Sequence, residues 1–343
     1  MITLTDVLKA TKGSCLGANP DTKIGELNFT GVSTDTRTIR PGELFIALQG
    51  DTFDGHAYVG QAAAKGAAAA VVSRPVETPS GLPQILVPDT LKAYQDIASF
   101  YRMSFPHLKV VAITGSNGKT STKDMIAAVL ATRYKVSKTR GNFNNEIGLP
   151  HTLLEITPTT EIAVTEMGMR GLGQIKAMCA FAKPDVAVIT NVGSTHVGEL
   201  GSLANIAKAK SEILEDLPQD GFAVLNGDLP RVRAMESKLH VPVSWFGLQP
   251  EDDVRAEAVE ITATGSTFLC KAGTEEATIF LPLIGEHNVM NALAAIAVGR
   301  YFGVKLNNMK NALAAVRITD SRQEVLHFGS YTVIDDAYNA SPA

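Results

Sequence analysis

One segment, Leu108 to Arg133 (LKVVAITGSNGKTSTKDMIAAVLATR), constrains the fold more than any other part of the chain. Its apolar run from Leu108 to Thr114 predicts a central parallel strand that is buried on both faces. A glycine-containing loop follows, and then apolar residues recur at helical spacing. The segment therefore predicts a strand, a glycine loop and a helix in direct succession.

This order suits phosphate binding, which needs backbone N–H groups at a helix start, glycines that allow close approach, and a cation. Lys119 would supply the cation and Thr120 a hydroxyl for Mg2+. The full phosphate-loop pattern has a glycine where this chain has Ile113, and a structural glycine turn is the alternative. The flanking strand and helix favour phosphate binding. The candidate residues are Gly115, Ser116, Asn117, Gly118, Lys119, Thr120 and Ser121.

Size and charge exclude some classes of protein. A chain of 343 residues has room for two or three domains, and its net charge of -4 favours neither a nucleic-acid partner nor stable membrane insertion. Cys15, Cys179 and Cys270 are far apart and have no metal-type spacing. With no secretory leader expected at the start, we predict a cytoplasmic protein.

Residues 1–87 predict a small α/β unit, with a strand at Leu44–Leu48, a helix at Ala57–Lys65 and a strand at Ala67–Val72. Pro75–Pro88 predicts a linker, and Leu91–Tyr101 a helix beyond it. Polar turns in this unit carry side chains that could grip a ligand, although turn chemistry alone accounts for them equally well. These residues are Ser33, Thr34, Asp35, Thr36, Arg37, Asp54, Gly55 and His56.

Two further strands in the middle region end in polar residues. Ile162–Glu166 ends in a carboxylate, and Asp185–Thr190 is followed shortly by His196. In an open parallel sheet, ligands lie outside the carboxyl ends of the strands. A solvated Glu and a loop His are the alternatives, but three such strands favour one shared site. The site would combine Lys119, Thr120, Glu166 and His196.

The polar loop Thr139–Pro150 is rich in asparagine. Asn142, Asn144 and Asn145 could bind a polar ligand or could simply form the loop. Spacing alone does not choose between these interpretations.

Ser202–Leu217 predicts a helix with Ser202 as its N-cap. Lys210 falls inside the apolar stripe of this helix, whereas Lys208 points to the other side. Lysine is among the residues least often buried, so this position needs an explanation. One explanation is a side chain that lies along apolar surface with its amine in water.

The last third of the sequence changes character. Period-two alternation between Val254 and Leu283 predicts a small antiparallel set of strands. A helix from Gly285 to Phe302 follows, with Asn288 and Asn291 on one face, and capping explains at most one of them. We expect a further helix at Leu306–Val316, a domain junction at Ile318–Arg322, and a strand from Tyr331 that begins a third domain.

Motifs along the whole chain resemble the ATP-dependent Mur ligases of peptidoglycan synthesis. In order, these motifs are TGSNGKTST, TEMG, TNVGSTH, AKSEI and GEHNVMN. The stretch VSTDTRTIRPGELFIALQGDTFDGH resembles the uridine-nucleotide-binding domain of the two later ligases of the pathway. KTRGNFNNEIGLP and DDAYNASP most resemble the member that joins D-Ala-D-Ala to UDP-MurNAc-tripeptide.

The resemblance implies an α/β enzyme of three domains: residues 1–87 for the UDP-MurNAc-peptide, 88–316 for ATP on a phosphate-loop parallel sheet, and 317–343 as the start of a Rossmann-like third domain. It implies that the peptide carboxylate attacks the γ-phosphate of ATP to give an acyl phosphate. The amine of D-Ala-D-Ala then displaces phosphate. The third domain is almost absent from the sequence, so we expect uridine-nucleotide binding with slow ligation.

The resemblance also implies roles for individual residues. Catalytic roles fall on Lys119, Glu166, His196, Lys210 and Arg322, the last as a γ-phosphate arginine. Thr120, Glu166, His196 and a carbamylated Lys210 belong to the Mg2+ sites. Asn288 and Asn291 lie on the adenine side, and Asp335 binds the ribose. Ser33, Thr34, Asp35, Arg37, Gly55, His56, Asn142 and Asn145 belong to substrate binding.

The sequence also allows other functions. One is the sibling ligase that adds the third amino acid, and another is a folylpolyglutamate synthetase, against which the amino-terminal uridine-nucleotide motif argues. A third is a nucleotide-binding module without full activity. We expect the protein to be a monomer.

Overall fold

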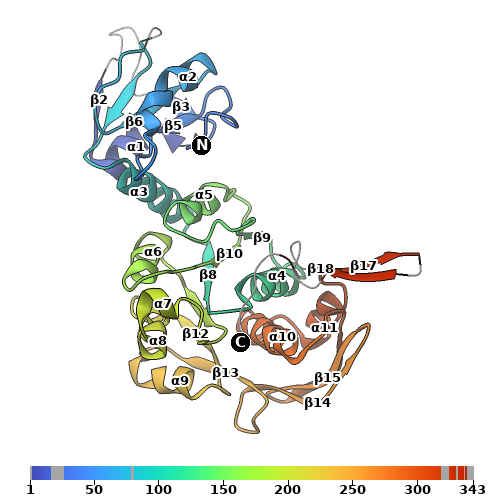
Figure 1. The fold of residues 1–343 in the computed structure, drawn as a ribbon. Coiled ribbons are helices and arrows are strands. Elements are labelled where there is room, and N and C mark those ends of the chain that lie inside the picture. The colour runs from blue at the N-terminus through green and yellow to red at the C-terminus, as the bar shows by residue number, and fades with distance from the viewer. Residues whose placement is uncertain are drawn as a thin grey trace. The chain divides into compact units, whose positions relative to one another are not determined.

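The computed structural model describes residues 2–16, 27–78, 81–317, 324–329, 331–335 and 337. The chain divides into two compact units (Figure 1). Unit 1 comprises Met1–Pro106 with Leu153–Glu155, and unit 2 comprises His107–Thr152 with Ile156–Ala343. Each unit combines helices with a largely parallel sheet, so the predicted α/β class is confirmed.

Unit 1 is built on a five-stranded sheet in the order β2-β7-β6-β5-β4, beside a short pair of β1 with β3. Strands β4 to β7 are parallel, and β2 runs antiparallel to β7. The elements are β1 (Ile2–Thr3), α1 (Leu4–Thr11), β2 (Ser14–Leu16), β3 (Asn28–Phe29), β4 (Val32–Ser33), β5 (Leu44–Ile46), the 3-10 turn η2 (Gly55–Tyr58), α2 (Val59–Ala64), β6 (Ala69–Val72), β7 (Gln84–Leu86) and α3 (Thr90–Met103).

The strands of unit 1 bury both faces because successive side chains point to opposite sides. Leu44 and Ile46 join the core that α1 and α3 cover. Phe45 joins the second core, which α2 covers through Val59. Helices on both faces explain why these strands are apolar throughout rather than alternating.

The predicted linker Pro75–Pro88 is wrong, because β7 lies within it and pairs with both β6 and β2. Ile85 is fully buried, and the Pro83 carbonyl accepts a hydrogen bond from the backbone of Ala70. Prolines flank the strand without interrupting it, since its central residues keep their N–H groups. Helix α3 packs into the same core through Tyr94, so unit 1 extends past the expected boundary at Val87.

Unit 2 contains a nine-stranded sheet in the order β16-β15-β14-β13-β12-β11-β8-β10-β9. Neighbouring strands are parallel along the sheet from β9 through β10, β8, β11, β12 and β13 to β14. Strand β15 runs antiparallel to both β14 and β16, and these three strands form the predicted antiparallel set. The strands are β8 (Lys109–Thr114), β9 (Val136–Lys138), β10 (Ile162–Glu166), β11 (Val186–Ile189), β12 (Phe222–Asn226), β13 (Val243–Gly247), β14 (Val254–Thr262), β15 (Gly265–Ala272) and β16 (Glu275–Leu281).

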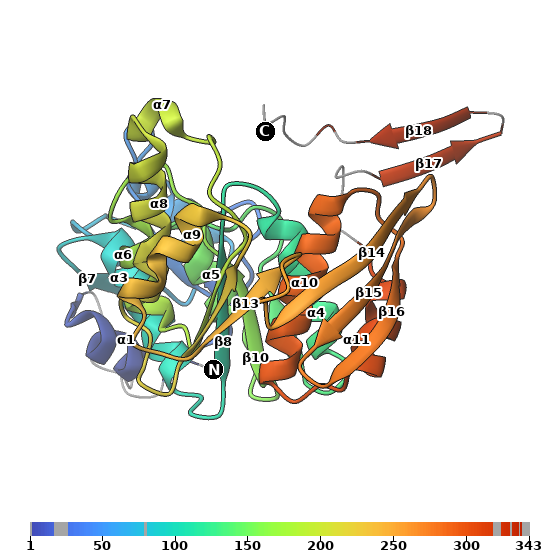
Figure 2. The ribbon, with the colours of Figure 1, turned by 90° about the horizontal axis from the view of Figure 1, so that it is seen from below.

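Helices cover the two faces of this sheet (Figure 2). One face carries α4 (Lys119–Leu130), α10 (Glu286–Tyr301) and α11 (Leu306–Ala314), and the other carries α6 (Gln174–Ala182) and α8 (Leu203–Ser211). The predicted helix Ser202–Leu217 continues after α8 only as the 3-10 turn η3 (Glu212–Leu214). The remaining elements are α5 (Gly148–Leu154), α7 (Val197–Leu200), α9 (Pro230–Arg233) and η4 (Ala234–Lys238).

Strand register brings the site residues to one edge. Glu166 at the end of β10 pairs with Ile113 of β8, and Ile189 of β11 pairs with Thr114 of β8. The loops that follow these three strands therefore begin side by side, as the sequence predicts for an open parallel sheet.

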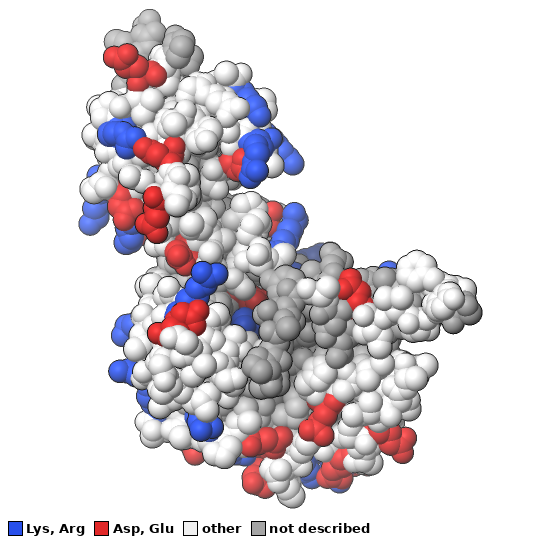
Figure 3. Space-filling view, in the orientation of Figure 1, with Lys and Arg blue, Asp and Glu red and all other residues white. Residues whose placement is uncertain are grey.

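An antiparallel hairpin of β17 (Glu324–Phe328) and β18 (Tyr331–Asp335) follows α11 in the sequence. The predicted junction Ile318–Arg322 lies outside the described residues. In the part of the chain that is described, every helix is too short or too polar to cross a membrane. On the face in Figure 3, acidic and basic residues are interspersed.

Candidate active site

The phosphate loop in unit 2 requires its glycines. A side chain at Gly115 would lie 1.8 Å from Thr190 Oγ1, and Gly118 has a left-handed φ of 77°. Lys119 is the first residue of α4, and its Nζ donates to the carbonyl of Gly115 at 2.8 Å. The loop thus places an ammonium and the first N–H groups of a helix at the same edge of the sheet, which suits a phosphate group.

The segment after β11 fixes the shape of this loop. Asn191 Oδ1 accepts from the backbone N–H of Asn117 at 2.9 Å, and Asn191 Nδ2 donates to the Asn117 carbonyl at 3.0 Å. Ser116 Oγ accepts from the backbone of Gly193 at 2.9 Å. Sequence reasoning did not assign a role to Asn191, although its place directly after a buried strand was a usable signal.

Glu166 lies at the centre of the site and is 3% exposed. Its Oε2 accepts from Thr120 Oγ1 at 2.8 Å, and its Oε1 accepts from Asn144 Nδ2 at 2.8 Å. The structure therefore brings together Thr120 and Glu166, two residues that sequence reasoning placed in one site.

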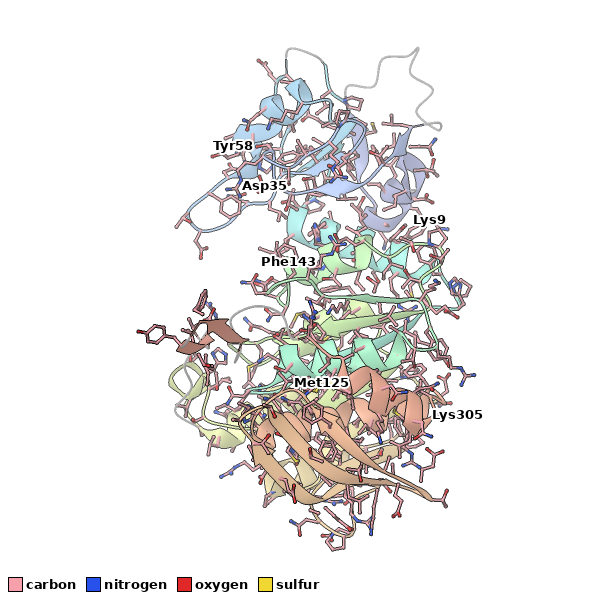
Figure 4. All side chains as sticks on the ribbon, turned by 90° about the vertical axis from the view of Figure 1, so that its right-hand side faces the viewer. Lys9, Asp35, Tyr58, Met125, Phe143 and Lys305 are labelled. Carbon is pink, nitrogen blue, oxygen red and sulfur yellow. The ribbon has the colours of Figure 1, made fainter. Side chains whose placement is uncertain are left out.

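The asparagines of the loop Thr139–Pro150 have two different roles. Asn144 contacts Glu166, whereas Asn145 Oδ1 accepts from the backbone of Gly148 at 2.8 Å, at the start of α5. Asn142 is exposed, as is its neighbour Phe143, which Figure 4 labels. The loop-forming interpretation therefore describes Asn145, and Asn144 is the residue that touches the site.

Lys210 on α8 is 2% exposed, so the interpretation with its amine in water is wrong. Burial lowers the pKa of Lys210 well below the usual value for lysine, and the charge of Lys119 lowers it further. Burial also lowers the pKa of His196, where Glu199 opposes the shift and Lys210 and Lys119 add to it. The charge of Lys119 thus acts on both His196 and Lys210, and the charge of Lys210 acts on His196.

Asn288 and Asn291 lie on α10, next to the phosphate-loop helix. Asn291 Oδ1 accepts from Thr122 Oγ1 at 3.1 Å, and a side chain at Gly118 would lie 2.5 Å from this oxygen. Asn291 Nδ2 donates to Asn288 Oδ1 at 3.3 Å. Both residues are 5% exposed, so α10 presents a buried polar pair to the loop.

The candidate ligand-binding residues of unit 1 form hydrogen bonds and an ion pair with one another. Asp35 accepts from Arg37, which holds the pKa of Asp35 below its usual value, and the Asp35 backbone donates to Ser33 Oγ at 3.2 Å. Thr34 lies between them and is half-buried. A side chain at Gly55 would lie 2.6 Å from the carbonyl of Leu48, so the turn needs glycine.

His56 braces the loop with both of its ring nitrogens. Its Nδ1 lies 2.6 Å from Asp54 Oδ1, and its Nε2 accepts from the backbone N–H of Ser73 at 2.9 Å. Because Nε2 accepts, the proton of the neutral ring is on Nδ1. The ring is buried, and its two contacts stabilise this turn.

Two predicted nucleotide residues belong to the last part of the chain. Arg322 lies outside the described residues. Asp335 ends β18, and its Oδ1 accepts from the backbone of Ala337 at 3.1 Å.

The donor set fits Mg2+ better than a transition metal. Within the described ranges, no three side chains of the types His, Cys, Asp and Glu gather into a metal site. Mg2+ usually keeps several waters and takes one or two protein carboxylates together with substrate phosphates. The Glu166 carboxylate and the Thr120 hydroxyl, beside a phosphate loop, provide that kind of partial site.

A parallel sheet with a phosphate loop, a lysine and a carboxylate at one edge defines a nucleotide-binding enzyme of the phosphate-loop class. Family models assign the chain more narrowly: the Mur ligase middle domain matches residues 113–299, and the Mur ligase family catalytic domain matches residues 28–102. The chain belongs to the Mur ligase family.

Individual proteins agree with this assignment. The UDP-N-acetylmuramoyl-tripeptide–D-alanyl-D-alanine ligase of Bacillus subtilis is 43% identical over 99% of this chain and 73% of the relative. A crystal structure of MurF from Acinetobacter baumannii matches with a TM-score of 0.92 and 32% identity, over 99% of this chain and 74% of that one. MurF from Thermotoga maritima in complex with ADP matches with a TM-score of 0.83 and 29% identity, over 92% and 73%.

Proposed function

We propose that this protein joins D-Ala-D-Ala to UDP-MurNAc-tripeptide at the cost of ATP. The observation that carries the proposal is the phosphate loop with Thr120 and Glu166 in direct contact at its edge, at 2.8 Å. The similarity to ligases with this named activity, over nearly the whole chain, supports the choice of substrates.

The proposed reaction has two steps. A carboxylate oxygen of the tripeptide attacks the γ-phosphorus of ATP, the bond to the bridging oxygen breaks, and ADP leaves. The amine of D-Ala-D-Ala then attacks the acyl phosphate carbon, loses a proton and releases inorganic phosphate as the amide forms. Catalysis of phosphoryl transfer is mainly positioning and charge stabilisation.

The residues of unit 2 would divide this work. Lys119 and the N–H groups that open α4 would neutralise charge on the β- and γ-phosphates. Thr120, Glu166 and His196 would hold Mg2+, which supplies further positive charge when it is bound. Asn288 and Asn291 would lie on the adenine side, with Asp335 at the ribose and Arg322 at the γ-phosphate.

We assign Lys210 the role of a carbamate. A neutral lysine amine adds to CO2, forms a C–N bond and releases one proton, so that a cation site becomes an anion. Its burial and its lowered pKa favour the neutral amine that this reaction needs. The carbamate oxygens are hard donors of the type that Mg2+ prefers.

Unit 1 would bind the uridine nucleotide through the turns at Ser33, Thr34, Asp35 and Arg37 and through Gly55 and His56. In unit 2, the exposed side chain of Asn142 would contact substrate. We also expect the protein to act as a monomer. The three cysteines are free thiols, in keeping with a reducing cytoplasm.

Phosphate release tests the function. The assay supplies ATP, UDP-MurNAc-tripeptide and D-Ala-D-Ala to this chain, and to the chain extended by the part of the Bacillus subtilis relative that it does not match. We expect release that needs all three substrates. Release that instead needs the dipeptide nucleotide and a single amino acid would identify the sibling ligase. ATP binding with no release in either form would support a binding module.

A further inference from the structure

Two adjacent charged residues of α4, Lys123 and Asp124, lie in the protein interior. Their side chains are 1% and 0% exposed. Moving charged groups out of water costs free energy unless they are paired with groups of opposite charge. The reaction proposed above uses neither residue, so their burial needs another explanation.

The Asp124 carboxylate has two lysine neighbours. Its Oδ1 accepts from Lys138 Nζ at 2.6 Å, and Lys123 Nζ lies 3.5 Å from the same oxygen. Across the described residues, no hydrogen-bond acceptor reaches Lys123 Nζ. Two lysines thus share one carboxylate, which leaves one positive charge of this cluster for a second anion.

That second anion is Glu166. Side chains on a helix lean toward its N-terminus, and Thr120, which donates to Glu166, lies three residues before Lys123 on the same face. Burial lowers the pKa of Lys123, whereas the negative charges of Asp124 and Glu166 raise it. Asp124 and Glu166 are therefore the two anions whose charge acts on the ammonium of Lys123.

We propose that Lys123 is a positioning residue: its ammonium is the built-in counter-charge of Glu166, and it weakens the binding of a divalent cation there until phosphates arrive. The inference rests on the proposed function in one respect, since it takes Glu166 as part of the metal site. A fixed cation near the carboxylate repels a metal ion that binds there. Nucleotide phosphates supply the negative charge that overcomes this repulsion, so metal binding is coupled to nucleotide binding.

Direct binding of Mn2+ to the nucleotide-free protein, followed by electron paramagnetic resonance, tests the proposal. Lys123→Met keeps the length of the side chain without its charge and should bind Mn2+ about tenfold more tightly than the unaltered chain. Asp124→Asn should bind it more weakly, because it leaves more positive charge facing Glu166. Lys138→Met removes the same charge from a side chain that is 43% exposed, and should change binding less.

The outcomes separate this inference from the proposed function. Equal Mn2+ affinities in Lys123→Met and the unaltered chain would overturn the inference. If Lys123→Met does not fold, Asp124→Asn decides, and tighter or unchanged binding there would overturn it. Glu166→Gln reports on the metal site itself: if it binds Mn2+ as well as the unaltered chain, the metal does not use Glu166 and this inference fails. The proposed function is tested separately, by phosphate release from the three substrates.

Discussion

Two lysines of unit 2, Lys210 on α8 and Lys123 on α4, are almost fully buried. The charged group that acts on Lys210 is a cation, whereas two carboxylates act on Lys123. Beside Lys210 is the cation Lys119, which adds to the lowering of its pKa by burial. Beside Lys123 are Asp124 and Glu166, which oppose that lowering. Burial alone therefore does not decide the state of a lysine. The sign of the neighbouring charge favours an amine and its carbamate at Lys210 and an ammonium at Lys123.

The largest effect should come from Lys210→Ala, which removes the proposed carbamate. We expect turnover to fall about 1000-fold, in line with loss of a group that stabilises the transition state. Acetate or formate should restore part of the activity by occupying the vacated space as a carboxylate. Lys208→Ala, on the exposed side of the same helix, is the matched control and should be nearly neutral. Normal turnover of Lys210→Ala would remove the carbamate from the account.

Lys119→Ala should cost about 100-fold or more in turnover, because it removes one preorganised charge from the phosphate loop. It also removes the cation that contributes to the lowered pKa of Lys210. Steady-state kinetics measure the effect, and circular dichroism should show an unchanged fold. Near-normal activity in a folded Lys119→Ala protein would contradict the phosphate-loop assignment.

Asn144→Ala should reduce turnover about 10- to 100-fold, the range typical for a residue that orients a metal ligand. The variant leaves Glu166 Oε1 without its hydrogen bond from Asn144 Nδ2. The Mg2+ concentration needed for half-maximal turnover should therefore change as well. Ile147→Ala is the control from the same loop, where the side chain is exposed. Equal losses in the two variants would mean that the loop acts as a whole and not through Asn144.

The smallest effect concerns stability and pH. In the unfolded chain both lysines titrate near the ordinary value of 10.5, and in the folded protein their pKa is lower. Between the two pKa values the unfolded state binds more protons, so stability rises as the pH rises toward 10.5. Lys210→Met should flatten this rise more than Lys123→Met, since burial and Lys119 both lower the pKa of Lys210, whereas Asp124 and Glu166 oppose the lowering at Lys123.

Urea unfolding between pH 7 and about 9.5, in buffer free of bicarbonate and divalent metal, measures this slope. Equal flattening in Lys210→Met and Lys123→Met would show that burial acts alike on both lysines. The contrast in their surroundings would then have no energetic consequence.

Sequence reasoning found the parts of the site that local pattern determines. The run from Leu108 predicted β8, and the boundaries predicted for β10 agree with Ile162–Glu166. The rule that parallel strands end at one edge then predicted that Thr120 and Glu166 are close. Each of these conclusions depends on period and order along the chain, which a single sequence records.

The rest of the site depends on side-chain orientation and packing, which spacing does not record. Three asparagines within four residues look alike in the sequence, and only the turn before α5 points Asn144 at Glu166. Helix α4 is buried on nearly all sides, so no apolar stripe marks Lys123 or Asp124 as interior residues. Strand β7 was missed because its three residues lie between prolines.

Carbon-13 nuclear magnetic resonance with labelled bicarbonate tests the contrast between the two lysines most directly. The account predicts one carbamate resonance in the unaltered chain, its loss in Lys210→Ala, and its persistence in Lys123→Met. A carbamate resonance that survives in Lys210→Ala, or disappears in a folded Lys123→Met protein, would contradict the account.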